Sequence, residues 1–304
     1  VEHVTHDFNV GHYSAVAIFL AASLYSNYTL DFENGVLDNL SGIYKFTAYL
    51  LTYAVAYFAV LLSVSIFKKE KSFWRSKWFW MKSVLMLLAL SADSSVPFLR
   101  PIVNELTNSH LELWVFKLTI NLVSGVLVLL PLLLFYYIVE RNDRHAYGLG
   151  IRPTDMRPYF VMLALMLPVI ILASFHPSFL KQYPMYRGGA EAAAYLGIPE
   201  WTTVIAYELA YAFDFVTLEF LFRGFMVIGL LQYTGRNSVL AMVAIYCFLH
   251  FGKPPGEAIS SIFGGYILGV IAYETKSIWG GIAVHIGIAW SMELTAFIQH
   301  QMMR

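Results

Sequence analysis

Long apolar runs separated by short polar segments dominate the pattern of this chain. Runs of about 20 residues recur along it, which is the length that an α-helix needs to cross about 30 Å of hydrocarbon. The expected spans cover roughly residues 13–30, 43–67, 78–93, 113–139, 158–175, 201–231, 238–251, 258–274 and 277–298. Backbone groups in lipid must be hydrogen-bonded within their own segment, so each run is predicted as a helix. The pattern predicts an all-α, polytopic membrane bundle of eight or nine transmembrane helices, since the third or the seventh run is too short to be certain to cross.

Composition agrees with this class of protein. Hydrophobic residues make up 58% of the chain and charged residues 13%, whereas a soluble domain carries about 25% charged residues. The formal net charge is zero and no basic tract stands out, so no nucleic-acid partner is expected. Membrane lipids are the first expected partner.

Basic residues indicate the orientation of the bundle. They gather after the second run, at Lys68, Lys69, Lys71, Arg75, Lys77 and Lys82, and after the fourth, at Arg141, Arg144, Arg152 and Arg157. Cytoplasmic loops of membrane proteins are enriched in Lys and Arg. Both loops and the N-terminus are therefore predicted to be cytoplasmic, in a bacterial-type inner (plasma) membrane. The chain divides into a four-helix N-terminal extension with its cytoplasmic loop, residues 1–157, and a C-terminal membrane core, residues 158–304.

The predicted helix 201–231 contains several ionisable residues, among them Glu208, Asp214, Glu219 and Arg223. Each costs about 2.5–3.5 kcal/mol at the centre of a membrane, so such groups are expected to face the interior of the bundle and to have partners. Glu219 and Arg223 are four residues apart, the spacing at which side chains on an α-helix meet, and are predicted to be in contact.

Two histidines complete a recognisable set of motifs. Glu219-Phe-Leu-Phe-Arg223-Gly is followed by Tyr246-Cys-Phe-Leu-His250 and by His285 in the last apolar run. This order resembles the CAAX-protease and bacteriocin-processing (CPBP) family of intramembrane proteases, whose motifs are Glu-Glu-x-x-x-Arg, Phe-x-x-x-His and His-x-x-x-Asn or Asp. The resemblance covers about residues 200–295 and implies a CAAX-protease-like core. Glycines support it: Gly265 and Gly269 form a small-xxx-small pair that allows close helix packing.

The match to these motifs has two gaps. Leu218 stands at the position of the first Glu, which in the family is thought to activate water. Ala289 stands at the position of the Asn or Asp, which together with the histidines is thought to bind and polarise the scissile carbonyl. The resemblance therefore implies Glu219, Arg223, His250 and His285 as the retained catalytic set. Asp214, one turn before Leu218, is the candidate for a displaced base.

Each of these residues has a second interpretation. Glu219 and Arg223 are more typical of a structural ion pair than of a catalytic element, and the histidines also fit ordinary interfacial or core positions. Glu219, His250 and His285 are also candidate ligands of a divalent metal such as zinc, because two His and one carboxylate are a common ligand set. No cofactor is otherwise expected. The histidines His3, His6 and His12 resemble a loose metal tract, although a flexible, solvated N-terminus is the favoured interpretation.

Two functions remain open at this stage. In the first, the protein has lost its chemistry and works as a scaffold or accessory subunit that binds other membrane-protein subunits. In the second, it is an active intramembrane endopeptidase with an altered site that cleaves a prenylated or other membrane-associated peptide. The missing base and amide favour the first function, and retention of both membrane-embedded histidines favours the second.

Overall fold

The computed structural model describes residues 8–141, 146–150 and 155–303. Every regular element in these ranges is helical, and none of the described residues lies in a β-strand. The all-α class is therefore confirmed. The expectations for His3, His6, Arg144 and Arg152 lie outside the described residues.

The chain forms two compact units, each built from several separate stretches of sequence. Unit 1 contains residues 1–95, 132–150 and 220–278, and unit 2 contains residues 96–131, 151–219 and 279–304. The sequence-based division at residue 157 concerns continuous segments and stays a prediction.

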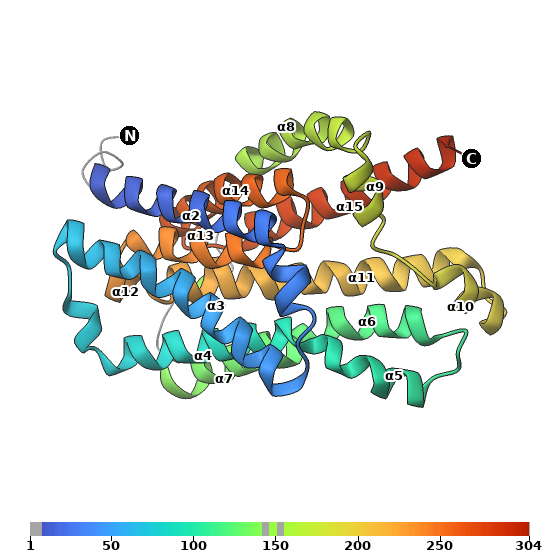
Figure 1. Cartoon of the computed structure of the whole chain (residues 1–304), viewed down its shortest axis with the longest axis horizontal. Helices are drawn as coiled ribbons and strands as arrows, with labels where there is room; N and C mark the ends of the chain where they lie inside the picture. The colour runs from blue at the N-terminus through green and yellow to red at the C-terminus, as the bar shows by residue number, and fades with distance from the viewer. Residues whose placement is uncertain (1–7, 142–145, 151–154, 304) are drawn as a thin grey trace. The chain divides into compact units, whose positions relative to one another are not determined.

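Unit 1 is arranged around helix α13 (Asn237–Leu249). Its other elements are α2 (Val10–Leu30), η1 (Phe32–Leu37), α3 (Gly42–Ser63), η2 (Val64–Lys68), η3 (Ser72–Arg75), α4 (Lys77–Ser94), most of α7 (Leu130–Val139), η6 (Ala146–Gly148), η7 (Phe220–Ile228), α12 (Leu231–Thr234) and α14 (Pro255–Thr275). Helix α13 packs against α3, α14 and η7, and every residue from Asn237 to Phe248 is buried. Figure 1 shows α13 next to α14.

The glycines of α14 allow this close packing. A Cβ atom on Gly269 would lie 2.7 Å from Cε of Met242, and one on Gly265 would lie 3.1 Å from the ring of Tyr246. Both contacts are with α13, so the small-xxx-small pair acts where the sequence suggested, at a helix–helix contact.

Unit 2 contains the helices that carry Glu219 and His285. Its elements are η4 (Val96–Leu99), α5 (Arg100–Leu106), α6 (Glu112–Ser124), η5 (Gly125–Leu129), α8 (Arg157–Ala173), α9 (Pro177–Gln182), α10 (Gly189–Leu196), α11 (Glu200–Glu219) and α15 (Trp279–Met302). Helix α11 packs against α6 and α15, and α15 packs against α8 (Figure 1). The contact between α11 and α15 brings together two segments that lie far apart in the sequence.

Four helical segments of the described chain are long and apolar enough to cross a membrane: Gly42–Lys68, Glu112–Val139, Pro255–Thr275 and Trp279–Met302. Arg157–Ala173 and Asn237–Leu249 are apolar but shorter. The helices follow the predicted runs to within about four residues, because the polar and Gly/Pro positions that ended the runs also end the helices. These segments support a membrane protein.

Two expectations about charged and polar residues were wrong. Lys82 does not belong to the basic loop, because it lies in α4 with a side chain that is 1% exposed and pairs with Glu140 at 2.6 Å. His12 is not part of a solvated tail, because α2 begins at Val10 and turns this side chain inward. Nδ1 of His12 lies 2.7 Å from the hydroxyl of Ser63, within hydrogen-bonding distance.

Candidate functional site

Glu219 and His285 meet inside unit 2. Glu219 is the last residue of α11 and is fully buried, and its carboxylate accepts a hydrogen bond from Nδ1 of His285 in α15. The ring of Phe215, one turn before Glu219, stacks on the imidazole at 5.7 Å between centroids. With Nδ1 donating to the carboxylate, Nε2 is left as the basic nitrogen of the neutral ring. The arrangement fixes both the tautomer and the direction of the imidazole.

Gly281 makes room for this carboxylate. A Cβ atom at this position would lie 2.2 Å from Oε2 of Glu219, far inside contact distance. Its neighbour Gly280 similarly admits the ring of Tyr159, which would lie 2.0 Å from a Cβ atom. The two glycines before His285 therefore have a physical role: they let α11 and α8 approach the first turn of α15.

Unit 1 holds the other two motif residues, again around a single aromatic ring. Arg223 is 1% exposed, and its Cζ lies 4.7 Å from the centroid of the Tyr246 ring. The ring of His250 meets the same Tyr246 edge to face at 4.5 Å, and Nδ1 of His250 donates to the backbone oxygen of Tyr246 at 2.8 Å. The aromatic residue of the second motif thus joins the Arg of the first motif to the His of the second.

The helix changes its winding between the two units. The α-helical hydrogen-bond pattern of α11 ends at Glu219, and η7 continues as a π-helix from Phe220 to Ile228. Short π-helical segments are rare and often occur at functional sites. The expected contact between Glu219 and Arg223 assumed a regular α-helix through both residues, and this premise is wrong. The pairing itself stays a prediction.

Gly224 is tightly enclosed, which explains why a glycine follows the Arg of the motif. A Cβ atom on Gly224 would lie 2.6 Å from the backbone oxygen of Tyr147. Lys82 fixes the same region: it donates to the backbone oxygen of Gly229 at 2.5 Å, and its ammonium lies 5.1 Å from the centre of the Tyr147 ring. The sequence did not predict this support, because its charge pattern placed Lys82 in a loop.

The loop after His250 is held by the last turn of α2. The side-chain amide of Asn27 donates to the backbone oxygen of Phe251 at 3.0 Å, and the hydroxyl of Tyr28 donates to that of Lys253 at 2.8 Å. Glu33, in η1 just after α2, accepts a hydrogen bond from Tyr49 at 3.3 Å. Burial and, to a lesser extent, the neighbouring Asp38 raise the pKa of Glu33 to about 7.

The two positions at which the motifs are incomplete are apolar. Leu218 is half-buried near the end of α11, and Ala289 is 4% exposed one turn after His285. Asp214 is half-buried one turn before Leu218. In the described ranges, no group of three or more His, Cys, Asp or Glu side chains is close enough to hold one metal ion. This finding gives no support to a metal at Glu219, His250 and His285, which stays a prediction.

Comparison with known proteins identifies the segment that carries these residues. Residues 199–291 match the family model described as type II CAAX prenyl endopeptidase Rce1-like. The match supports membership of this segment in the CPBP family. The CPBP segment begins just before α11 and ends within α15, and it includes all five candidate site residues. No significant match was found among curated proteins or among solved structures.

The structure places the predicted residues of the CPBP segment in two separate contacts. It brings Glu219 to His285, and Arg223 to Tyr246 and His250. The sequence identified these residues from their order alone. It did not identify Gly281 or the bridging role of Tyr246, although the Gly-Gly pair before His285 was a visible signal for a close helix contact.

Proposed function

We propose that this protein is a CAAX-protease-like membrane protein with a degenerate catalytic set, and that it works as a scaffold or accessory subunit of a membrane complex. The observation that carries the proposal is the pair of apolar side chains at the functional positions, Leu218 and Ala289. The first offers no base for water, and the second offers no hydrogen-bond donor for a developing oxyanion.

The expected loss of activity is large. General-base assistance is typically worth about 10²–10⁴-fold and one oxyanion donor about 10²–10³-fold. These contributions are not additive when residues act together, yet losing both leaves little hydrolysis. Ala289 is 4% exposed, so the space around it is filled by protein and offers little room for a water molecule to replace the missing donor.

The retained residues have a structural role in this proposal. The hydrogen bond between Glu219 and His285 joins α11 to α15, and Arg223 packs on the ring of Tyr246. Removing one partner of such a buried contact is costly, which is a sufficient reason to keep both. The expected partners are membrane lipids, another membrane-protein subunit, or a prenylated or membrane-embedded peptide held without cleavage. The proposed setting is a bacterial-type inner membrane, with eight or nine spans and a cytoplasmic N-terminus.

One observation favours the second candidate, an active endopeptidase with an altered site. The carboxylate–imidazole pair of Glu219 and His285 is the arrangement by which an acidic side chain orients a histidine base in other hydrolases. Nε2 of His285 would then take the proton from water, a function that the family assigns to the missing Glu. Asp214 is the other candidate base.

Purified protein in lipid nanodiscs separates the two proposals. Wild type, Leu218→Glu/Ala289→Asn, Asp214→Ala and His285→Ala would be assayed on a panel of prenylated and transmembrane peptides. The scaffold proposal expects no cleavage by wild type and gain of cleavage by the double variant. Cleavage by wild type that is abolished in His285→Ala or Asp214→Ala would overturn it and identify the base.

A further inference from the structure

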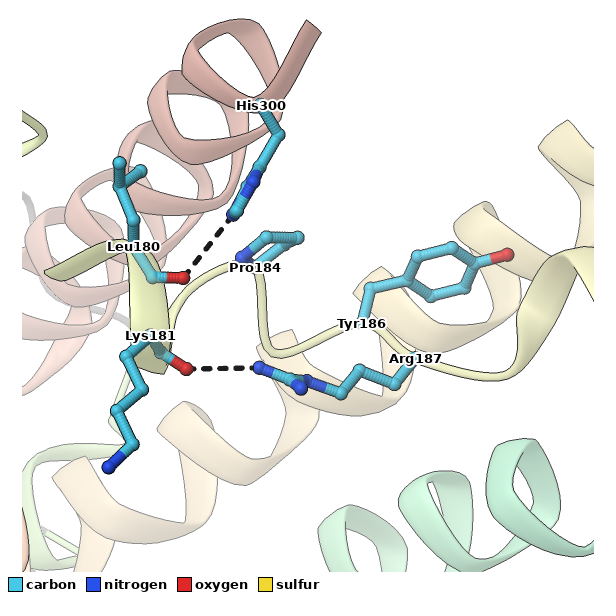
Figure 2. Close-up of a pocket in the computed structure, with 6 residues that line it drawn as sticks. All are labelled: Leu180, Lys181, Pro184, Tyr186, Arg187 and His300. Carbon is cyan, nitrogen blue, oxygen red and sulfur yellow. Dashed lines mark hydrogen bonds between the residues drawn. The ribbon is translucent and has the colours of Figure 1, made fainter. Parts of the chain in front are cut away.

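An open basic cavity lies in unit 2, and none of its lining residues belongs to the CAAX-protease-like motifs. Its volume is about 440 Å³, and it is lined by Leu180, Lys181, Pro184, Tyr186, Arg187 and His300. Figure 2 shows His300 on one side of Pro184, and the side chains of Lys181 and Arg187 on the other. This volume lies within the range of about 300–1,000 Å³ that is typical of small-molecule sites.

Hydrogen bonds across the cavity fix its walls. Nη2 of Arg187 donates to the backbone oxygen of Lys181 at 3.1 Å, and Nε2 of His300 donates to that of Leu180 at 3.3 Å (Figure 2). A guanidinium group has five N–H donors in a planar fork, so this one bond leaves most of the fork of Arg187 for a ligand. The cavity therefore has a defined shape and retains hydrogen-bond donors.

Residues 183–187, which include three of the residues that line the cavity, are anchored to α15. Glu293 in α15 is 6% exposed, and its two carboxylate oxygens accept the backbone N–H groups of Met185 at 2.7 Å and Tyr186 at 3.2 Å. Tyr183 is 2% exposed in a small core with Ile170, Phe179 and Ala296. The backbone that presents Arg187 is thus held in place before any ligand binds, which reduces the cost of binding.

The charge of the cavity is positive. Lys181 and Arg187 are both exposed, and neither takes part in an ion pair within the part of the chain that the structure describes. The nearby carboxylate of Glu293 is buried and already bonded to two backbone N–H groups. An anion that enters the cavity would meet the planar guanidinium of Arg187 and the ammonium of Lys181, and proteins use both kinds of group to bind phosphate.

The position of the cavity points to the source of that phosphate. Residues 179–187 come soon after the apolar helix α8. Phe179 and Tyr183 among them pack on the C-terminal part of α15, one of the helices long enough to cross a membrane. Large apolar side chains at the end of α8 are exposed, with Leu172 at 73% and Phe175 just beyond it at 64%. An apolar exposed belt beside a basic cavity fits the boundary between acyl chains and headgroups. We propose that this cavity binds the phosphate of an anionic phospholipid headgroup.

The test uses the full chain, purified in a neutral detergent and titrated with three probes. These are short-chain phosphatidylglycerol, short-chain phosphatidylcholine and inorganic phosphate, with binding followed by calorimetry. Wild type is expected to bind phosphatidylglycerol at least tenfold more tightly than either other probe. Equally tight binding of phosphatidylcholine would overturn the charge selectivity, and equally tight binding of inorganic phosphate would identify a free anion instead of a lipid.

Matched variants connect this binding to the cavity. Lys181→Gln/Arg187→Gln is expected to weaken phosphatidylglycerol binding at least tenfold. The control, Lys71→Gln/Arg75→Gln, removes the same two residue types from exposed positions in unit 1 and is expected to change it less than twofold. Equal weakening in both variants would reduce the effect to net charge and overturn the site. Arg187→Lys keeps the charge but loses the planar fork, and it is expected to bind phosphatidylglycerol severalfold more weakly than wild type. This variant also tests the site if the double variant does not fold. Unchanged binding by Arg187→Lys would overturn the role of the fork.

Discussion

Glu219 combines full burial with a hydrogen bond from a histidine on another helix. Sequence reasoning predicted that this acid would face the interior, because a charged group in lipid is costly. It did not predict the contact with His285, because 66 residues separate the two side chains and only the packing of α11 on α15 brings them together. Residue types and order were readable from the sequence, whereas this pairing was not.

The contact between Glu219 and His285 is expected to contribute measurably to stability. His285→Ala should lower the free energy of unfolding by about 1–3 kcal/mol, because the buried carboxylate loses a hydrogen-bond donor. Thermal or denaturant unfolding in nanodiscs measures the change. His110→Ala is a matched control: its imidazole contacts Glu191 at 2.8 Å, but both side chains are more than half exposed. This exposed pair should change stability by less than about 1 kcal/mol, and equal effects of the two substitutions would contradict the prediction.

Gly281 offers an independent test of the same contact. Gly281→Ala would place a methyl group 2.2 Å from Oε2 of Glu219. Overpacking of this kind typically costs about 1–3 kcal/mol, and it should also displace the carboxylate from His285. The control is Gly264→Ala in α14, where a Cβ atom meets nothing within 4 Å. There alanine should be neutral or stabilise the helix by up to about 1 kcal/mol. A Gly281→Ala protein as stable as wild type would show that Glu219 is not confined there.

At the scale of helices, the bounds of the elements were predictable but their winding was not. Apolar runs and the polar, Gly and Pro positions between them located the helices to within a few residues. The π-helix from Phe220 to Ile228 has no comparable signal, because its hydrogen-bond pattern depends on packing against neighbours such as Gly224 on Tyr147. Lys82 was misassigned for the same reason: only the tertiary structure supplies Glu140 as its partner.

Lys82, in α4, contacts Glu140 just after α7 and Gly229 just after η7, and it should be important for the stability of unit 1. Its ammonium lies 2.6 Å from Oε2 of Glu140 and 2.5 Å from the backbone oxygen of Gly229. Lys82→Met leaves Glu140 without this cation. Breaking a buried ion pair typically lowers the free energy of unfolding by about 3–5 kcal/mol. Because Glu140 is 16% exposed, we expect a loss at the lower end of this range. Adding Glu140→Gln should recover at least half of the lost stability. Lys77→Met, at an exposed position of the same helix, should cost less than about 0.5 kcal/mol. No recovery in the double variant would contradict an ion-pair explanation.

Glu33, in η1, should make the stability of the protein depend on pH. The pKa of Glu33 is about 7 in the folded protein, above its ordinary value of 4.5, so the folded state retains a proton that the unfolded chain has released. The resulting stabilisation is fully present below about pH 4.5 and is lost as pH rises through about 7, by about 1–3 kcal/mol for a partly exposed group.

Comparison with Glu33→Gln isolates this effect, because glutamine does not titrate. The stability of wild type relative to the variant should be greater at pH 5 than at pH 8, as measured by denaturant unfolding at several pH values. The charged groups that face Glu33 are Asp38, Lys45 and Lys253, and they remain in both proteins. A difference between the two proteins that does not change with pH would contradict the assignment.

At the scale of the whole molecule, the sequence predicted an all-α membrane protein but not the composition of the two units. Each unit combines three distant stretches of chain, and Glu219 and Phe220 are neighbours in sequence but belong to different units. Hydropathy and charge report on local segments only, so they predict a division into the continuous segments 1–157 and 158–304, which stays a prediction. The family match likewise covers one stretch, residues 199–291.

Orientation in the membrane can be tested by labelling. With Cys247 replaced by alanine, single cysteines at Ser72→Cys and Asp155→Cys are expected to react with an impermeant reagent only after the cells are opened, because both loops are predicted to be cytoplasmic. Ala194→Cys, between the fifth and sixth predicted spans, should react in intact cells. Labelling of position 72 or 155 from outside would reverse the orientation.

The shortness of α13 has a consequence for how lipid thickness acts on this protein. Its 13 residues extend about 20 Å, less than the hydrocarbon core, and its residues from Asn237 to Phe248 are enclosed by protein. Hydrophobic mismatch acts on helices that face lipid, so α13 is insulated from it. The depth of His250 is set by the surrounding helices, with the loop that follows it anchored by Asn27 and Tyr28. In bilayers with longer or shorter acyl chains, the lipid-facing helices should tilt while His250 keeps its place relative to Tyr246 and Arg223.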